Sequence, residues 1–200
     1  QAGLAGESAA GLLLEQWSPR QLRIYSRSEA AQVLLRRQLN DDRRVRFVIG
    51  DVRDPERLTQ AAQGVDTIFH LAALKHVPVC EENPFEAVKT NVLGTQVVID
   101  AALACGVKRV IDISSDKAAS PLNLYGTTKS IGEKLVVSAN NLSETTACIC
   151  IRAGNVLGTA GSVVPLFRSQ VLHRNMVTVT DPEMTRFFLN VRDVIGMILE

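Results

Sequence analysis

The chain has 200 residues, 46% of them hydrophobic, and its formal net charge at pH 7 is +1. This length corresponds to one domain, or one domain and part of another, with enough apolar side chains for a sizeable core. The balanced charge gives no reason to expect a nucleic acid or a membrane surface as partner. The sequence shows no signal peptide and no run approaching the roughly eighteen apolar residues of a spanning helix.

The four cysteines are Cys80, Cys105, Cys148 and Cys150, and none forms a C-x-x-C pair. A chain of this size does not need disulfides to fold, so we expect free thiols and a reducing, cytoplasmic location. Both ends look cut, because position 1 is not Met and the final VRDVIGMILE breaks off inside a helical pattern. We therefore expect a fragment of a longer protein.

Strands and helices alternate along the chain. Short apolar, β-branched runs predict strands at Leu22–Tyr25, Val45–Ile49, Thr67–Leu71, Arg109–Ile113 and Ala147–Ile151. Helical patterns lie near residues 4–16, 28–40, 55–63, 84–105 and 124–141. This alternation indicates βαβ units, and the apolar strands indicate a parallel sheet covered on both faces. We predict an α/β fold, a doubly wound parallel sheet, over residues 1–157.

Three helix starts are visible. Asp54-Pro55 and Asn83-Pro84 each place an N-cap residue before a Pro at the first helical position. Pro121 and Asn123 set up the start of the helix near residues 124–141.

The N-terminal stretch QAGLAGESAAGLLLEQ places Gly3 and Gly6 before a helical pattern, as in a glycine turn that binds phosphate at a helix N-terminus. This signal is weak by itself, because two glycines at this spacing are common and the strand that should precede them is missing.

The strand near Leu22 ends in IYSRSE, where a nicotinamide dinucleotide site reads the adenosine ribose. An acidic residue there binds a free 2′-hydroxyl, whereas Arg accommodates a 2′-phosphate. Ser26 and Arg27 therefore favour NADP over NAD, although a solvated Arg at a helix start is an equally good interpretation of these two residues alone.

The next two strand ends also carry candidate cofactor contacts. They are Asp51 and Val52, suited to clasp an adenine, and the small residues Ala72 and Ala73 after Leu71, which let a cofactor approach the backbone. Tight strand-to-helix turns are the structural alternative. Lys75 and His76 are polar groups at the same edge, and no spacing of Cys, His and carboxylates predicts a metal site.

Residues 114–129, SSDKAASPLNLYGTTK, gather proton-handling groups after the strand at Arg109–Ile113. Ser115, Asp116 and Lys117 supply a hydroxyl, an acid and an amine, and Tyr125 and Lys129 lie one helical turn apart. An ammonium one turn from a phenol lowers the pKa of the phenol, which makes Tyr125 a usable acid or base. In a purely structural interpretation, Asp116 is a cap and Lys117 is solvated.

With these residues the sequence resembles the extended short-chain dehydrogenases/reductases, and within them the UDP-N-acetylglucosamine 4,6-dehydratases of surface-polysaccharide and flagellar-glycan biosynthesis. The resemblance runs almost from end to end, through the stretches GDVRD, GVDTIFHLAALKHVP, NPFEAVKTNVLGT, ISSDKAASPLNLYGTTK, GNVLG, GSVVPLF and TVTDPEMTRFF. It implies a Rossmann-like fold, NADP as cofactor, a UDP-sugar substrate and a homo-oligomer. Residues 158–200 would begin a smaller sugar-nucleotide-binding lobe.

The resemblance implies roles position by position. The implied catalytic residues are Ser115, Asp116, Lys117, Tyr125 and Lys129. The implied cofactor contacts are Gly3, Gly6, Ser26, Arg27, Asp51, Val52, Leu71, Ala72, Ala73, Asn91, Tyr125 and Lys129. The implied substrate contacts are Lys75, Lys117, Asn155 and Arg186, and no metal is implied.

The implied reaction is an elimination without net redox. Tyr125 would remove the proton of the sugar 4-hydroxyl as hydride passes from C4 to NADP⁺. The resulting 4-ketone would acidify the C5 hydrogen, which a partly neutral Lys117 would abstract. A protonated Asp116 would donate its proton to the departing 6-hydroxyl, and hydride would then return to C6. Tyr125 and the YSR stretch resemble the short soluble enzymes that also invert C5, on the route to pseudaminic acid.

The sequence departs from the family where RAGNVLGTAGS puts Ala153 and Ala160 in place of a Tyr and an Arg, which leaves the exact sugar nucleotide open. Three alternatives remain. A 4-epimerase of the same superfamily would not need the pair of Asp116 and Lys117. A non-catalytic NADP-binding regulator would not need Tyr125 and Lys129. The isolated 200 residues would, in the third alternative, bind nothing by themselves.

Overall fold

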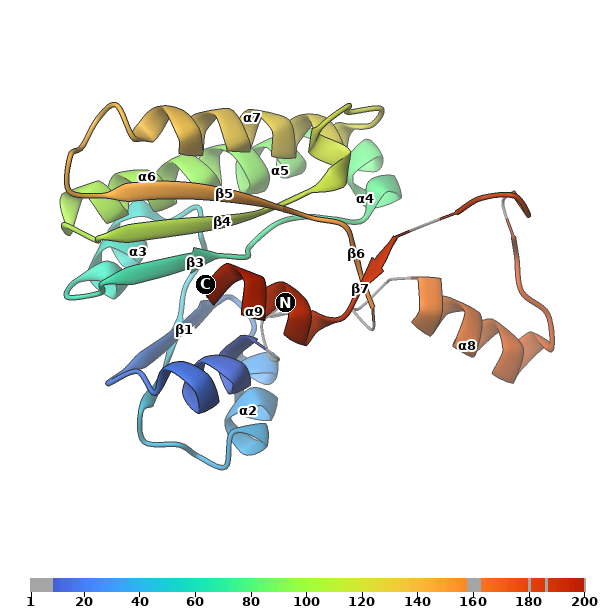
Figure 1. Cartoon of the computed structure of the whole chain (residues 1–200), viewed down its shortest axis with the longest axis horizontal. Helices are drawn as coiled ribbons and strands as arrows, with labels where there is room; N and C mark the ends of the chain where they lie inside the picture. Colours follow the sequence, from blue (N-terminus) through green and yellow to red (C-terminus); the bar gives the residue numbers. More distant parts are fainter. Residues whose placement is uncertain (1–8, 158–162, 180, 186, 200) are drawn as a thin grey trace. The chain divides into compact units, whose positions relative to one another are not determined.

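Figure 1 shows the chain as a computed structural model, which describes residues 9–157, 163–179, 181–185 and 187–199. These residues belong to two compact units, one formed by residues 21–153 and the other by residues 9–20 together with residues from 154 onward. The expected functional division into residues 1–157 and 158–200 stays a prediction.

The first unit contains five parallel strands, and all five were predicted. They are β1 (Leu22–Ser26), β2 (Val45–Ile49), β3 (Thr67–His70), β4 (Arg109–Ser115) and β5 (Ala147–Ala153). The predicted ends are correct to within about two residues, as is usual for boundaries defined by hydrogen bonds. The alternation of strands and helices thus confirms the α/β class.

Among the described residues these strands form two sheets, as expected for a doubly wound sheet without its first strand. β1 pairs with β2, and the second sheet has the order β3-β4-β5. In the doubly wound order 3-2-1-4-5, one further strand lies between the positions occupied here by β1 and β3. The two sheets therefore correspond to the two halves of a doubly wound sheet.

The helices of this unit lie between the strands in the sequence. They are α2 (Glu29–Gln38), α3 (Pro55–Ala62), α4 (Val77–Glu82), α5 (Pro84–Val88), α6 (Gly94–Ala104), α7 (Leu124–Ala139), the π-helical turn η2 (Lys89–Leu93) and the 3₁₀ turn η3 (Asp116–Ala118). The predicted helix at 84–105 is the continuous run α5-η2-α6. The sequence pattern missed α4, because six residues are too short to show a helical period.

All three predicted N-cap positions are confirmed, and two of them carry a side-chain capping bond. Asp54 accepts a hydrogen bond from the backbone N–H of Arg57 at 3.0 Å, and Asn123 accepts one from Gly126 at 2.9 Å. Asn83 occupies the predicted N-cap position before Pro84, but its side chain makes no capping bond and instead donates from Nδ2 to the carbonyl of Val79 at 3.1 Å. Asn83 ends α4, and this competing local bond occupies its amide.

The core of the first unit lies between the β3-β4-β5 sheet and helices α3, α6 and α7, which Figure 1 shows on one side of the sheet. Its buried side chains include Leu58, Val98, Val110 and Val136. Ile149 of β5 is 42% exposed, so the described residues do not cover both faces as the apolar strands had suggested.

The described residues of the second unit form a short parallel pair and three helical segments. Residues 9–12 are α-helical and continue into the π-helical turn η1 (Leu13–Trp17), within the helix expected at 4–16. The other elements are β6 (Asn155–Val156), α8 (Val163–Arg174), β7 (Phe188–Leu189) and α9 (Val191–Leu199), with β6 parallel to β7. In the part of the chain that the structure describes, no helix combines the length and apolarity needed to cross a membrane.

Candidate active site

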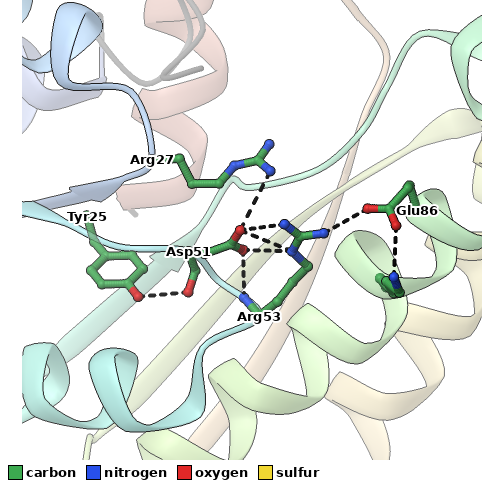
Figure 2. Close-up of polar contacts among 6 residues, drawn as sticks. Tyr25, Arg27, Asp51, Arg53 and Glu86 are labelled. Carbon is green, nitrogen blue, oxygen red and sulfur yellow. Dashed lines mark hydrogen bonds and ion pairs between the residues drawn. The ribbon is translucent and has the colours of Figure 1, made fainter.

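The carboxyl ends of β1 and β2 carry a network of charges centred on Asp51 (Figure 2). Arg53 donates to the Asp51 carboxylate from Nε at 3.0 Å and from Nη2 at 2.7 Å, and its Nη1 reaches Glu86 at 2.8 Å. Arg27 approaches the same carboxylate at 3.6 Å and is half exposed. Two guanidinium groups therefore converge on one carboxylate at this edge.

The arginines keep Asp51 ionised. The hydrogen bond from Arg53 lowers the pKa of the Asp51 carboxyl, burial opposes this shift, and the charge of Arg27 adds to it. Because the carboxylate is engaged by Arg53, the predicted adenine contact of Asp51 stays a prediction. Val52 is half buried and lies against the start of α6, where a Cβ on Gly94 would be 2.9 Å from its Cγ1.

Tyr25 holds β1 and β2 together at the same place. Its hydroxyl donates to the backbone carbonyl of Asp51 at 2.8 Å, and its ring fills the space that a Cβ on Gly50 would need. Burial raises the pKa of Tyr25 to about 12, so the phenol stays protonated. Sequence reasoning assigned no role to Tyr25 or Arg53, although both lie in stretches, YSR and GDVRD, that it singled out.

Ser26 and Arg27 face different surroundings. The hydroxyl of Ser26 accepts a hydrogen bond from Nε2 of Gln32 at 3.0 Å, which ties it to α2. Arg27, with about half of its side chain exposed, keeps most of its donors available for a ligand. Of this pair, Arg27 is therefore the residue able to bind an incoming anion.

The loop after β3 is held by the side chain of Asn91, which is buried in η2. Its Oδ1 accepts from the backbone N–H of Leu74 at 2.8 Å, while Nδ2 donates to the carbonyl of Leu74 at 2.9 Å and to Oγ1 of Thr128 at 3.0 Å. Thr128 in turn donates to the carbonyl of Tyr125 at 2.9 Å. Asn91 thus connects the β3 loop to the first turn of α7, and a cofactor contact by its side chain stays a prediction.

Three small or apolar residues follow β3 directly. Leu71 and Ala72 are exposed and Ala73 is half buried. They therefore leave an accessible stretch of backbone at the carboxyl end of the strand, where parallel α/β sheets bind their ligands. Their predicted contact with a cofactor is compatible with this position and stays a prediction.

The carboxyl end of β4 brings together Ser115, Asp116 and Lys117, as predicted from their adjacency. Ser115 Oγ donates to Asp116 Oδ1 at 3.0 Å and accepts from the backbone N–H of Lys117 at 3.3 Å. Lys117 Nζ donates to the same Oδ1 of Asp116 at 2.9 Å. The Ser115 hydroxyl also lies near enough to Tyr125 to act on the pKa of its phenol, which places the phenol beside this group.

A close approach of backbone fixes this arrangement. A Cβ on Gly126, in the first turn of α7, would lie 2.5 Å from the carbonyl oxygen of Lys117. A residue with a side chain would push η3 and α7 apart, so a glycine is required for α7 to begin against the turn that carries Asp116 and Lys117.

The protonation states differ from those expected for Asp116 and Tyr125. Burial acts to raise the pKa of Asp116, but hydrogen bonds from Lys117 and Ser115 together lower it, so the free site holds a carboxylate and an ammonium. Burial raises the pKa of Tyr125, and the neighbouring Ser115 hydroxyl acts against this shift. The expected lowering by a neighbouring ammonium is absent, because Lys129 has another partner.

That partner is Asp112, in the middle of β4. Lys129 Nζ lies 3.3 Å from each carboxylate oxygen of Asp112, and the two side chains are 4% and 0% exposed. Sequence reasoning missed Asp112. The available signal was an acidic residue inside the apolar run RVIDI, since a buried carboxylate needs a partner.

The remaining predicted residues are not part of this cluster. Lys75 is an exposed residue, and the partial burial of its amine lowers its pKa. Asn155 belongs to the second unit, where its Nδ2 lies 3.5 Å from the carbonyl of Phe187. Gly3, Gly6 and Arg186 lie outside the described residues. Among the residues described, no group of His, Cys, Asp and Glu is arranged to hold a metal.

A parallel α/β sheet with Ser, Tyr and Lys side chains gathered at its carboxyl edge defines a Rossmann-like protein of the extended short-chain dehydrogenase/reductase type. The chain belongs to the polysaccharide biosynthesis protein family, whose profile matches residues 2–200.

Two curated relatives represent the similarity in sequence. The chain is 44% identical over 200 residues to the UDP-N-acetylglucosamine 4,6-dehydratase (inverting) of Campylobacter jejuni subsp. jejuni serotype O:23/36 (strain 81-176), covering 98% of the chain and 60% of that protein. It is 42% identical over 183 residues to the UDP-glucose 4-epimerase of Rickettsia conorii, covering 90% of the chain and 53% of that protein. The chain thus spans little more than half the length of these relatives.

Two solved structures represent the similarity in fold. Pen from Bacillus thuringiensis superposes with a TM-score of 0.94 at 42% identity, over 98% of this chain and 63% of that one. A double mutant of the dTDP-glucose 4,6-dehydratase DesIV from Streptomyces venezuelae, with NAD bound, gives a TM-score of 0.87 at 25% identity, over 98% of this chain and 68% of that one.

Proposed function

We propose that the whole protein is a nucleotide-sugar 4,6-dehydratase, a hydro-lyase that converts UDP-N-acetylglucosamine to UDP-2-acetamido-2,6-dideoxy-hexos-4-ulose with inversion at C5. The observation that carries this proposal is the 2.9 Å contact between Lys117 Nζ and Asp116 Oδ1 beside Tyr125. It supplies a base and an acid next to each other, which an elimination needs and a simple dehydrogenation does not. The 44% identical relative with this activity supports it.

The proposed cofactor is a nicotinamide dinucleotide, with NADP preferred over NAD. Its adenosine end fits at the ends of β1 and β2, where the half-exposed Arg27 offers a guanidinium for a 2′-phosphate. Leu71 and Ala72 leave backbone exposed at the end of β3, where the cofactor would pass. The similar dehydratase with NAD bound supports the cofactor class and makes NAD the alternative outcome. When bound, the cofactor supplies the acceptor and later the donor of the hydride.

The side chains at the end of β4 divide the proton transfers among them. Tyr125 takes the proton of the sugar 4-hydroxyl, and Ser115, which lies beside Tyr125, orients the phenol. Lys117 abstracts the C5 hydrogen, which a 4-ketone makes acidic. Asp116 donates a proton to the departing 6-hydroxyl, so that water leaves.

The ion pair of the free site can become the acid and base of the elimination by moving one proton. The pair of Asp116 carboxylate and Lys117 ammonium has the same net charge as the pair of Asp116 carboxylic acid and Lys117 amine. A bound sugar nucleotide would displace water from these partly exposed side chains, and loss of water favours the neutral forms. Substrate binding therefore transfers the proton from Nζ to Oδ1 along their existing hydrogen bond.

A second candidate is a UDP-sugar 4-epimerase, which the 42% identical relative from Rickettsia conorii favours. An epimerase would use Tyr125 in the same way but would leave Asp116 and Lys117 without a proton to transfer at C5 or C6. The two candidates are therefore separated by the fate of the C5 hydrogen.

The test is to incubate the complete protein with UDP-N-acetylglucosamine and NADP in D₂O and to follow the sugar by proton NMR. A 6-deoxy-4-keto product with deuterium at C5 is expected, and its coupling constants report inversion or retention. UDP-N-acetylgalactosamine as product would support the epimerase instead. Absence of turnover with NADP bound would contradict both and favour a regulator. Tyr125→Phe is the matched inactive control.

The proposal also includes the setting of the enzyme. All four cysteines are free thiols, which favours a reducing, cytoplasmic compartment. The pathway would be surface-polysaccharide or flagellar-glycan biosynthesis of the pseudaminic acid type. Helix α7 exposes Ile131 and Val137, apolar side chains that a homo-oligomer would cover.

A further inference from the structure

A row of titratable side chains crosses the β3-β4-β5 sheet beneath α7. His70, Asp112 and Cys150 are register partners on the three neighbouring strands, so their side chains lie on the same face of the sheet. Lys129 reaches this row from α7. His70, Asp112 and Lys129 are all less than 5% exposed. Only Lys129 was among the catalytic residues predicted from the sequence.

Two members of the row are uncharged. Thr95 donates its hydroxyl hydrogen to the carbonyl of Asn91 at 2.8 Å, so it accepts at 3.0 Å from Nε2 of His70, which fixes the His70 tautomer. Burial lowers the pKa of His70 to about 4, and burial followed by the charge of Asp112 raises the pKa of Cys150 to about 12. The Cys150 thiol donates to Asp112 Oδ2 at 3.7 Å. The charges in the row are therefore those of Asp112 and Lys129.

The position of Lys129 matters because it lies one helical turn from Tyr125. An ammonium that turns toward a phenol stabilises the phenolate. An ammonium bound by a carboxylate stabilises it less, because the negative charge offsets the positive one. The Lys129 ammonium lies 3.3 Å from both carboxylate oxygens of Asp112, so it is held by that carboxylate. Burial is the main cause of the raised pKa of Tyr125, and the negative charge of Asp112 raises this pKa further.

We propose that Asp112 is a positioning residue that acts through Lys129, because it holds the ammonium on the sheet side of α7 and so sets the charge that Tyr125 meets. This inference rests on the proposed function, in which Tyr125 takes the proton of the 4-hydroxyl. It adds a residue of β4 that never touches the substrate but controls when the phenol becomes a base.

A substitution at Asp112 leaves the other groups that face Tyr125 unchanged. They are Ser115 at the end of β4, Asp116 in η3 and Cys80 in α4. Around Asp112 the constant groups are His70 on β3 and Cys150 on β5, while Glu133 lies near Lys129 on α7. A change at Asp112 alone therefore reports on its pair with Lys129.

The test is a tyrosinate titration of the complete protein by ultraviolet difference spectroscopy, without substrate. The transition that disappears in Tyr125→Phe belongs to Tyr125. In Asp112→Asn, we expect this transition to move to lower pH by about one unit, because a negative charge is removed and the ammonium is released toward the phenol. The acidic limb of the kcat/KM profile should move in the same direction. The titration needs no turnover, so it stays readable even if the proposed dehydratase activity fails.

A cycle with Lys129→Met tests whether Asp112 acts through Lys129. In that background, Asp112→Asn should shift the Tyr125 transition by less than about a third of the shift seen with Lys129 present. An equal shift in both backgrounds, or no shift in folded Asp112→Asn, would overturn the proposal. If the Asn variant does not fold, Asp112→Ser, which leaves room for a water beside the ammonium, takes its place with the same expectation.

Discussion

Asn91 and Thr128 are joined by a buried hydrogen bond of 3.0 Å that links the π-helical turn η2 to the first turns of α7. The same Asn91 amide holds both backbone groups of Leu74, so one side chain connects the loop after β3 to the helix that carries Tyr125. π-helical turns inside α-helices often occur at functional sites, and here the turn supplies the residue that connects two parts of the site.

Asn91→Ala should lower the free energy of unfolding by roughly 3 kcal/mol, because it leaves the backbone groups of Leu74 without their partners. Chemical denaturation at neutral pH measures this loss. Asn141→Ala, at an exposed position after α7, is the matched control and should change the stability by less than about 0.5 kcal/mol. Equal effects of the two substitutions would contradict the linking role of Asn91.

Gly126→Ala should lower stability by about 2 kcal/mol or more, since its Cβ would collide with the backbone carbonyl of Lys117 and not with a flexible side chain. The same substitution should reduce activity, because Asp116 and Lys117 lie on the displaced turn. Gly11→Ala, where a Cβ meets no atom within 4 Å, is the control and should be neutral or slightly stabilising. Thermal unfolding of both variants provides the comparison.

Asp51→Asn should lower the free energy of unfolding by about 1 kcal/mol at pH 7, because the bidentate bond to Arg53 is weakened. The pKa of Asp51 is lower in the folded than in the unfolded chain. Its stabilisation is therefore fully present above the unfolded-state pKa of about 3.9 and is lost as the pH falls through the folded-state pKa.

The difference in unfolding free energy between the natural chain and Asp51→Asn should thus be constant above about pH 5 and shrink below pH ~4. Urea denaturation across this range measures it. A difference that grows toward acid pH would show that Asp51 is not held by the arginines.

Arg27→Ala should weaken NADP binding by roughly 10- to 100-fold, as expected for the loss of a charge-assisted contact to a 2′-phosphate. Binding of NAD should change by less than about threefold, since NAD lacks this phosphate. Isothermal titration calorimetry with both dinucleotides measures the ratio. Arg43→Ala, at an exposed position before β2, is the control. If Arg27→Ala weakened both cofactors equally, Arg27 would not read the 2′-phosphate.

Asp116→Asn and Lys117→Met should separate the two proton transfers of the elimination. Without the Asp116 acid, the C5 hydrogen of recovered substrate should still exchange with D₂O while product formation falls by about 100-fold or more. Without the Lys117 amine, both exchange and product should be lost. Proton NMR of the sugar measures both quantities, and Lys108→Met, in an exposed ion pair with Asp66, is the control for loss of a lysine. Exchange that survives in Lys117→Met would assign the base elsewhere.

Local patterns in the sequence predicted most of the first unit. Strand runs such as Val45–Ile49 and caps such as Asp54 and Asn123 depend on neighbours within a few residues, so the sequence alone contains the information. The same holds for the cluster of Ser115, Asp116 and Lys117, because adjacent residues at the end of a parallel strand must share one edge of the sheet.

Contacts between distant residues needed the tertiary structure. The sequence placed Lys129 one turn from Tyr125, but only the packing of α7 on β4 brought its ammonium to Asp112, 17 positions earlier. The pKa of Tyr125, expected to be lowered by that ammonium, is instead raised, mainly by burial of the phenol. Likewise, Asn83 matched a capping pattern, yet the preceding helix α4 occupied its amide. By itself, the sequence determined which groups line the carboxyl edge; the tertiary structure decided their charges, because a buried charge depends on the partner that packing brings within hydrogen-bond distance.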